Sequence, residues 1–107
     1  MNKKNVDVAI KVIDEFGGTE GNFGCFEEDD LQKLVKIAEQ EDMLCLSFID
    51  LPQDTYFNEL QCRDIQKELV ILRNYIELDS KLLEAIYKAV ELALKEESYV
   101  KFEVIQE

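Results

Sequence analysis

Hydrophobic and polar residues alternate with a period of two in two well-separated parts of the chain. Residues 6–13 (VDVAIKVI) and residues 99–105 (YVKFEVI) show this pattern, which is typical of strands that bury one face. Residues 6–13 are also compatible with a short helix, but their β-branched content favours the strand. A compact apolar run at residues 43–49 (MLCLSFI) predicts one further strand.

Apolar residues recur at helical spacing in three other stretches. A first helix is expected after the four consecutive acids of residues 27–30, because acidic side chains in a first turn complement the helix dipole. A second helix is expected over residues 58–73, and a third over residues 80–95 behind an Asp79–Ser80 cap. Residues 16–24 (FGGTEGNFG) hold all four glycines and are predicted to form a loop.

These elements predict an α+β fold in one domain, residues 1–107, with the order β-α-β-α-α-β. We expect a three-stranded mixed sheet with the helices packed on it. The helix between the first two strands would make a right-handed crossover, so these strands would run parallel. The last strand would follow a there-and-back helix pair and run antiparallel to the second.

The chain contains no histidine. This absence removes Ser-His and Cys-His nucleophilic catalysis, His-ligated metals and the commonest general base. Cys25, Cys45 and Cys62 are widely spaced without a CxxC pair, which indicates neither a disulfide framework nor a zinc site. We therefore expect a protein that is not an enzyme and that has no catalytic residues, metal site or cofactor.

No apolar run approaches the roughly 18–20 residues that cross a bilayer. The apolar stretch near the N-terminus is interrupted by Asp7 and Lys11, so it does not resemble a signal peptide. A cytoplasmic protein without a membrane partner is expected.

The net charge of −12 is unevenly distributed, because residues 12–62 carry 13 acids against only Lys33 and Lys36. In a parallel β-α-β unit the carboxyl ends of both strands meet at one edge, which is the usual place for a binding site. That edge would gather Asp14, Glu15, Glu20, Glu27, Glu28, Asp29, Asp30, Asp50, Asp54 and Glu59. Direct binding of DNA or RNA is disfavoured, since phosphate contacts need Lys and Arg.

Residues 46–61 (LSFIDLPQDTYFNELQ) place two carboxylates, two aromatic rings and an amide directly after the predicted second strand. Phe57 and Phe16 are expected in the core, whereas Tyr56 is expected to be exposed. Exposed tyrosines among carboxylates suit a basic protein surface, since interface hot spots favour Tyr and Arg. The predicted partner-binding residues are Asp50, Asp54, Thr55, Tyr56 and Asn58, backed by Glu27, Glu28, Asp29 and Asp30.

Two other interpretations of these residues remain open. Asp50 and Asp54, joined by Asp14 or Glu28, could hold Mg²⁺ or Ca²⁺ through oxygen ligands and so support a metal-dependent hydrolase. Alternatively, Asp50 caps the turn and Asn58 or Asp54 caps the following helix, in a structural module without catalysis. A solvated acidic face with no partner would also account for the charge.

The segment IDLPQDTYFNELQ and the terminal YVKFEV resemble a group of small bacterial proteins of uncharacterised role. Their loop reads approximately I-D-P-Y-G-D-T-x-F-N-x-L-Q. The matching residues here are Ile49, Asp50, Asp54, Thr55, Phe57, Asn58, Leu60 and Gln61. Pro52 stands one position later than in that pattern, Gln53 replaces its glycine, and the chain closes in EVIQE where glycine-aspartate would be expected. This resemblance covers the second half of the chain and implies no established activity.

In size, acidity and layout the chain is similar to immunity proteins that neutralise bacterial toxins. That similarity of class implies an immunity-type inhibitor that covers a basic partner protein, such as a toxin nuclease. The oligomeric state is not determined, although the last strand could pair two copies edge to edge.

Overall fold

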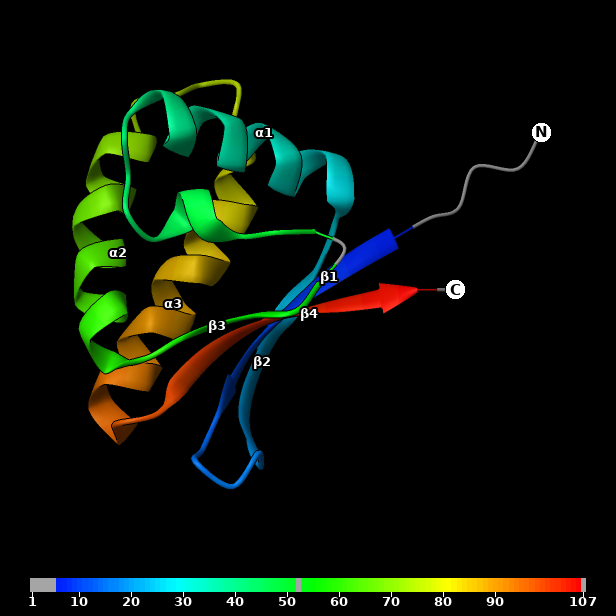
Figure 1. The fold of residues 1–107 in the computed structure, drawn as a ribbon, viewed down its shortest axis with the longest axis vertical. Coiled ribbons are helices and arrows are strands. Elements are labelled where there is room, and N and C mark those ends of the chain that lie inside the picture. Colours follow the sequence, from blue (N-terminus) through cyan, green and yellow to red (C-terminus); the bar gives the residue numbers. More distant parts are fainter. Residues whose placement is uncertain (1–5, 52, 107) are drawn as a thin grey trace.

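The computed structural model describes residues 6–51 and 53–106 and contains a four-stranded antiparallel sheet with the strand order β2-β1-β4-β3 (Figure 1). The fold is α+β, but the predicted three-stranded mixed sheet and the order β-α-β-α-α-β are wrong. The elements are β1 (Val6–Ile13), β2 (Thr19–Glu27), α1 (Glu28–Gln40), the 3₁₀-helix η1 (Leu46–Phe48), β3 (Thr55–Phe57), α2 (Glu59–Leu72), α3 (Ser80–Glu96) and β4 (Tyr99–Gln106).

The helices lie on one face of the sheet, and the core fills the space between the two layers (Figure 1). Phe57 of β3 packs against Phe102 of β4 with ring centroids 5.8 Å apart and ring planes perpendicular. The alternation predicted for β1 and β4 is confirmed, because the inward residues Val8, Ile10, Val12, Val100 and Phe102 are fully buried.

Only the first three residues of the glycine-rich segment 16–24 belong to a turn, and from Thr19 onward the segment is a strand and not the predicted loop. The turn is confined to residues 14–18, where the Asp14 carboxylate accepts the N–H groups of Phe16 (2.9 Å) and Gly18 (2.8 Å). The glycines that follow lie in β2, whose register against β1 shifts twice, and Gly24 sits at one of these bulges with φ +110°. Glycine within a strand often marks a bulge, and bulges blunt an edge strand against pairing with other chains.

Residues 43–49 do not form the predicted strand. They adopt turns and the single 3₁₀ turn of η1, and Thr55–Phe57 is the strand that joins the sheet instead. The predicted parallel unit is therefore absent, since every strand pair in the described sheet is antiparallel. The final strand lies between β1 and β3, and β3 covers one side of it only over Val100–Phe102.

The helix starts and ends agree closely with the local signals. The acids of residues 28–30 fill the first turn of α1. Asn58 caps α2 in a reciprocal capping box with Gln61, and the Asp79 side chain accepts the N–H of Lys81 at the start of α3. Such caps satisfy backbone N–H groups that have no partner within the helix. Of the two capping residues proposed for α2, Asn58 is thus the one used.

Candidate functional site

Asp54, predicted to contact a partner, lies directly before the first residue of β3 and continues the pairing with β4 through its side chain. Its Oδ1 accepts the backbone N–H of Val104 at 2.8 Å, which is the group a longer β3 would have paired. Its Oδ2 lies 3.9 Å from the Nζ of Lys101. The carboxylate therefore satisfies the backbone of β4 and partly balances a lysine, both within the fold.

Several of the predicted partner-binding residues near Asp54 already form hydrogen bonds within the fold. The Thr55 hydroxyl accepts the N–H of Asp50 at 3.4 Å, and Asn58 is committed to the α2 cap. Tyr56 is 50 % exposed, as predicted, and its ring centroid lies 5.4 Å from the Nζ of Lys101. Of the five residues predicted in this segment, Asp50 is the one whose exposed side chain forms no hydrogen bond with the described part of the chain, whereas the half-exposed Tyr56 is hydrogen-bonded to Lys101.

A row of alternating charges crosses the sheet face that carries no helix. Lys11 and Lys101 lie 2.9 Å and 3.4 Å from Oε1 of Glu103. The hydrogen bond from Lys11, against the opposing effect of burial, lowers the pKa of Glu103 below its ordinary value. Burial opposes the charge on Lys101, but Tyr56 and Glu103 together raise its pKa. The row formed by Lys11, Glu103, Lys101 and Asp54 is therefore balanced in charge.

The acids at residues 27–30 lie at the same end of the sheet as Asp54. The register aligns Phe26 with Val8 and Val8 with Val104, whose N–H meets Asp54. Three steps between neighbouring strands, each about 4.8 Å, separate this acidic run from Asp54 by roughly 14 Å. The structure therefore brings these two predicted groups to one end of the sheet without bringing them into contact.

The acids predicted to join them from the first turn lie at the opposite end. Asp7 pairs with Glu27, whereas Ile13 pairs with Thr19 next to the turn. A rise of about 3.4 Å per residue along β1 places the two ends roughly 20 Å apart. The single acidic edge predicted from a parallel unit is thus wrong, because antiparallel strands send their carboxyl ends in opposite directions.

At this second end the turn acids meet acids from the far end of the chain. A shallow hollow of about 320 Å³ is lined by Asp14, Glu15, Glu20, Glu96, Glu97, Ser98 and Tyr99. Five of these seven residues are carboxylates, and none of the described residues that line the hollow is Lys or Arg. We call these five carboxylates the acidic hollow. Glu96 and Glu97 were not among the predicted site residues, because only the antiparallel return of β4 brings the end of α3 to the β1–β2 turn.

Within the acidic hollow some carboxylates serve the fold and others do not. Asp14 organises the turn, and Glu20 accepts a hydrogen bond from the buried Ser98 hydroxyl. Glu15, Glu96 and Glu97 form no side-chain hydrogen bond or ion pair with the described residues.

An exposed aromatic side chain stands beside these carboxylates. Phe16 was expected to close the core at the end of the first strand, but it is 90 % exposed at the tip of the turn. Tyr99, also exposed, lines the hollow itself. The reason is geometric: the turn projects beyond the helical layer, so no core is left at that point for Phe16 to enter (Figure 1).

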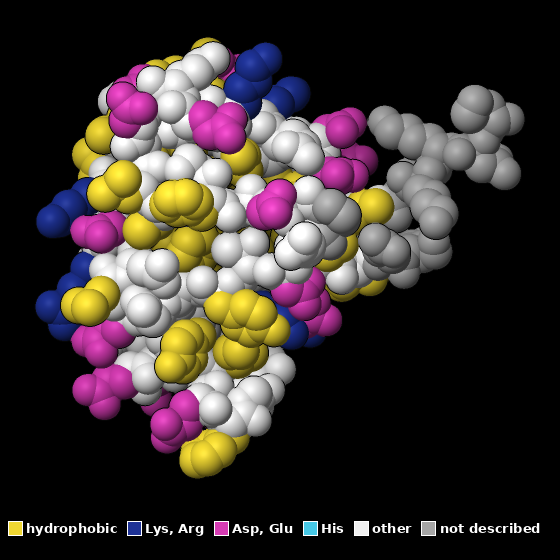
Figure 2. Space-filling view, viewed as in Figure 1, with side chains coloured by type: hydrophobic (Ala, Val, Ile, Leu, Met, Phe, Trp, Pro, Cys, Tyr) yellow, Lys and Arg dark blue, Asp and Glu magenta, His cyan; other side chains and the backbone are white. Residues whose placement is uncertain are grey.

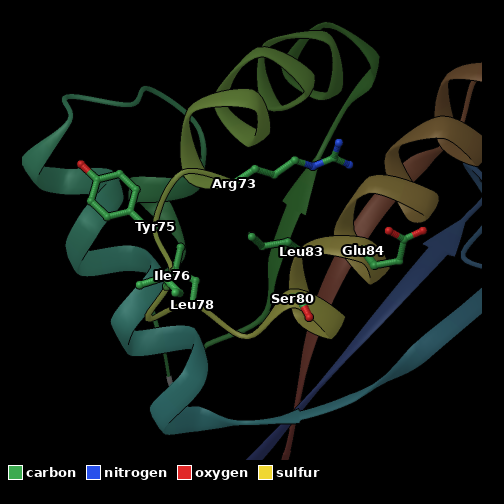
Figure 3. Close-up of a pocket in the computed structure, with 7 residues that line it drawn as sticks. All are labelled: Arg73, Tyr75, Ile76, Leu78, Ser80, Leu83 and Glu84. Atoms are coloured by element: carbon green, nitrogen blue, oxygen red, sulfur yellow. The ribbon is translucent and has the colours of Figure 1, made fainter.

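A further pocket of about 480 Å³ lies where α2 joins α3 (Figure 3). Figure 3 shows Arg73 extending toward α3, where its guanidinium lies 4.9 Å from the ring of Tyr87, while Tyr75 turns away from Leu83. The pocket combines one base, Arg73, and one acid, Glu84, with apolar walls. Ser80 and Tyr75 add hydroxyl groups, but the Ser80 hydroxyl forms no hydrogen bond with a base among the described residues.

The described ranges contain no group of three or more Cys, Asp or Glu arranged to hold a metal ion. Within the same ranges, no helix has the length and apolarity needed to span a bilayer. No protein-family model, curated protein or solved structure matches the chain.

Proposed function

We propose that this chain is a small binding protein that covers a cationic surface of another protein, in the manner of an immunity-type inhibitor that covers a toxin nuclease. The observation that carries the proposal is the acidic hollow, in which three chain segments bring five carboxylates together with no base among the lining residues. The similarity of the chain to immunity proteins in acidity, size and layout also supports the proposal.

Gathering like charges in one place raises the energy of the folded state through repulsion. A cationic partner would relieve this repulsion, and the field of the hollow would speed the encounter between the two proteins. Glu15, Glu96 and Glu97 contribute charge without bonding to the described fold, so a partner could use them fully.

Phe16 offers a partner an apolar contact, which the carboxylates of the acidic hollow cannot make. Aromatic side chains are enriched in interface cores, where they fill apolar pockets surrounded by polar contacts. A partner that fits this end of the molecule would present Lys or Arg side chains around an apolar depression. The other acidic end, with residues 27–30, Asp50 and Tyr56, is the competing location for the same function.

The two locations can be separated with variants of equal charge change. The tagged wild-type chain is used to capture partners from a lysate of the source organism at low and high salt. Binding of the captured protein is then measured for Glu15→Gln/Glu96→Gln/Glu97→Gln and for Glu27→Gln/Glu28→Gln/Asp30→Asn. The proposal expects the first triple variant to weaken binding at least about tenfold and to flatten its salt dependence, with little change in the second.

Loss of binding in the second triple variant alone would move the site to the other acidic end, which holds residues 27–30, Asp50 and Tyr56. Equal binding by both variants at both salt concentrations would contradict a charge-driven interface altogether. An activity assay of the captured protein, with and without this chain, decides whether binding also inhibits.

A further inference from the structure

The segment from Asp42 to Ile49 exposes apolar side chains although its backbone is firmly held. Met43, Cys45, Leu46 and Ile49 point into the core, which explains why the stretch is almost wholly apolar. Leu44 and Phe48 point outward and are 72 % and 67 % exposed.

Four interactions keep this segment in place. The buried carboxylate of Glu68 accepts the N–H groups of Cys45 and Leu46, each at 2.9 Å. The N–H of Met43 donates to the carbonyl of Ala38 at 2.9 Å, and the Ser47 hydroxyl donates to the carbonyl of Met43. Exposure of Leu44 and Phe48 is therefore built into the fold and is not the result of a loose loop.

The two exposed side chains lie on a groove with an acidic rim. The groove has a volume of about 420 Å³ and is lined by Glu39, Asp42, Met43, Leu44, Ser47 and Phe48. No Lys or Arg is among these residues. On the face shown in Figure 2, hydrophobic side chains lie exposed among acidic ones, and basic side chains gather mainly at the margins. We call this feature the η1 groove.

From this arrangement we propose that the η1 groove is a docking site for a cationic, amphipathic segment of a partner protein. One or two leucine-like side chains of that segment would pack against Leu44 and Phe48. Lysine or arginine side chains on either flank would meet Glu39 and Asp42. Charge complementarity selects this occupant, because a second copy of the chain would bring carboxylates against carboxylates.

The η1 groove shares no lining residue with the acidic hollow. The inference therefore stands independently of the proposed function: the groove can bind its segment whether or not the hollow binds a partner. A single large partner could also use both surfaces.

The probe is a fluorescently labelled, helix-forming 14-residue peptide of leucine and lysine. Two control peptides keep its length, one with serine in place of every leucine and one with glutamate in place of every lysine. Binding to the full chain is measured by anisotropy, and the site is located by amide chemical shifts. We expect saturable binding of the leucine–lysine peptide alone, with the largest shifts at residues 39–49.

Two matched pairs of variants test the contacts. Leu44→Ser/Phe48→Ser removes the proposed apolar contacts, whereas Leu60→Ser/Val70→Ser removes two apolar side chains of α2 that are exposed to the same extents, 72 % and 67 %. The first pair should weaken peptide binding about tenfold or more, and the second pair less than about twofold. All four positions are exposed, so the variants should fold, which circular dichroism checks.

Glu39→Gln/Asp42→Asn should weaken binding about three- to fivefold. Glu84→Gln/Glu91→Gln changes the net charge equally at two exposed positions of α3 that line neither the η1 groove nor the acidic hollow, and it should have no comparable effect. Asparagine suits position 42, where φ is +56°.

Four results would overturn the proposal: no saturable binding of the leucine–lysine peptide, equal binding of the serine–lysine peptide, equal losses in a matched pair, or shifts centred outside residues 39–49. A dimer of the wild-type chain that Leu44→Ser/Phe48→Ser dissociates, seen by sedimentation, would identify the groove as a self-association surface and would also overturn it.

Discussion

Glu68 on α2 and Cys45, 23 residues earlier in the chain, are joined by a hydrogen bond from the Cys45 N–H to Oε2 of the buried carboxylate, 2.9 Å long. The other oxygen, Oε1, accepts the N–H of Leu46 at the same distance. These two N–H groups stand at the start of η1. The Glu68 carboxylate accepts them in place of the carbonyl groups that a paired strand would have offered. A buried carboxylate is tolerated when it is fully hydrogen-bonded.

Glu68→Ala should destabilise the fold by about 2–4 kcal/mol, because it leaves two buried N–H groups without a partner and opens a cavity. Glu68→Gln should lower the free energy of unfolding by only about 1–2 kcal/mol, since the amide retains one acceptor oxygen. Urea unfolding of each variant measures the change. Glu84→Ala, at an exposed helix position, is the matched control and should change stability by less than about 0.5 kcal/mol. Comparable losses at both positions would contradict the role of Glu68.

The two oxygens of Asp54 have separable roles. Asp54→Asn keeps an acceptor for the Val104 N–H but removes the charge near Lys101, so it should cost less than about 0.5 kcal/mol. Asp54→Ala removes both the acceptor and the charge and should lower the free energy of unfolding by about 1–2 kcal/mol. Hydrogen exchange at the Val104 amide should accelerate in the alanine variant alone; equal exchange in all three proteins would show that the bond is unimportant.

The predicted partner-binding residues Asp50 and Asp54 can be tested with a variant that preserves the sheet. If Asp50 and Asp54 contact a cationic partner, Asp50→Asn/Asp54→Asn should weaken its association and flatten the salt dependence. Binding of the captured partner at two salt concentrations measures this. Unchanged affinity and an unchanged salt slope would leave Asp54 with its structural role only.

The three thiols should react at very different rates. Burial raises the pKa of Cys62 to about 11, and burial together with the nearby charge of Glu68 raises the pKa of Cys45 to about 11. Both are inaccessible thiols at neutral pH, whereas Cys25 is exposed. Iodoacetamide at pH 8 should therefore modify Cys25 first, and the other two only in urea. Mass spectrometry of peptides reads the order, and early modification of Cys45 would argue against the packing around Glu68.

The charge row on the open sheet face should stabilise the protein only while Glu103 is ionised. Folding lowers the pKa of Glu103 below its ordinary value of 4.5. The stabilisation that this residue provides is therefore complete above pH 4.5 and is lost as the pH falls through the pKa of the folded state. Since these side chains are partly exposed, the contribution should be at most about 1 kcal/mol. The stability difference between wild type and Glu103→Gln, measured by urea unfolding from pH 7 to pH 3, should shrink at the acidic end. A difference that stays constant with pH would exclude this role for Glu103.

Local chemistry determined a large part of the fold. The alternation in β1 and β4, the capping residues Asn58 and Asp79, and the acidic start of α1 were readable because each depends on residues within one turn or one strand. The segments that were misread depend on distant partners. The glycines of β2 become a bulged strand only because β1 pairs with them, and residues 43–49 are an irregular segment only because Glu68 supplies the acceptors.

The candidate sites divide in the same way. The sequence by itself determined that the chain is strongly acidic, lacks histidine and carries exposed Tyr56 beside carboxylates. Only the tertiary structure decided which acids meet. Antiparallel pairing separates Glu15 from residues 27–30 and brings it to Glu97, and packing turns Leu44 and Phe48 outward from an apolar run. Such contacts depend on strand direction and on the packing of distant segments, which no local pattern encodes.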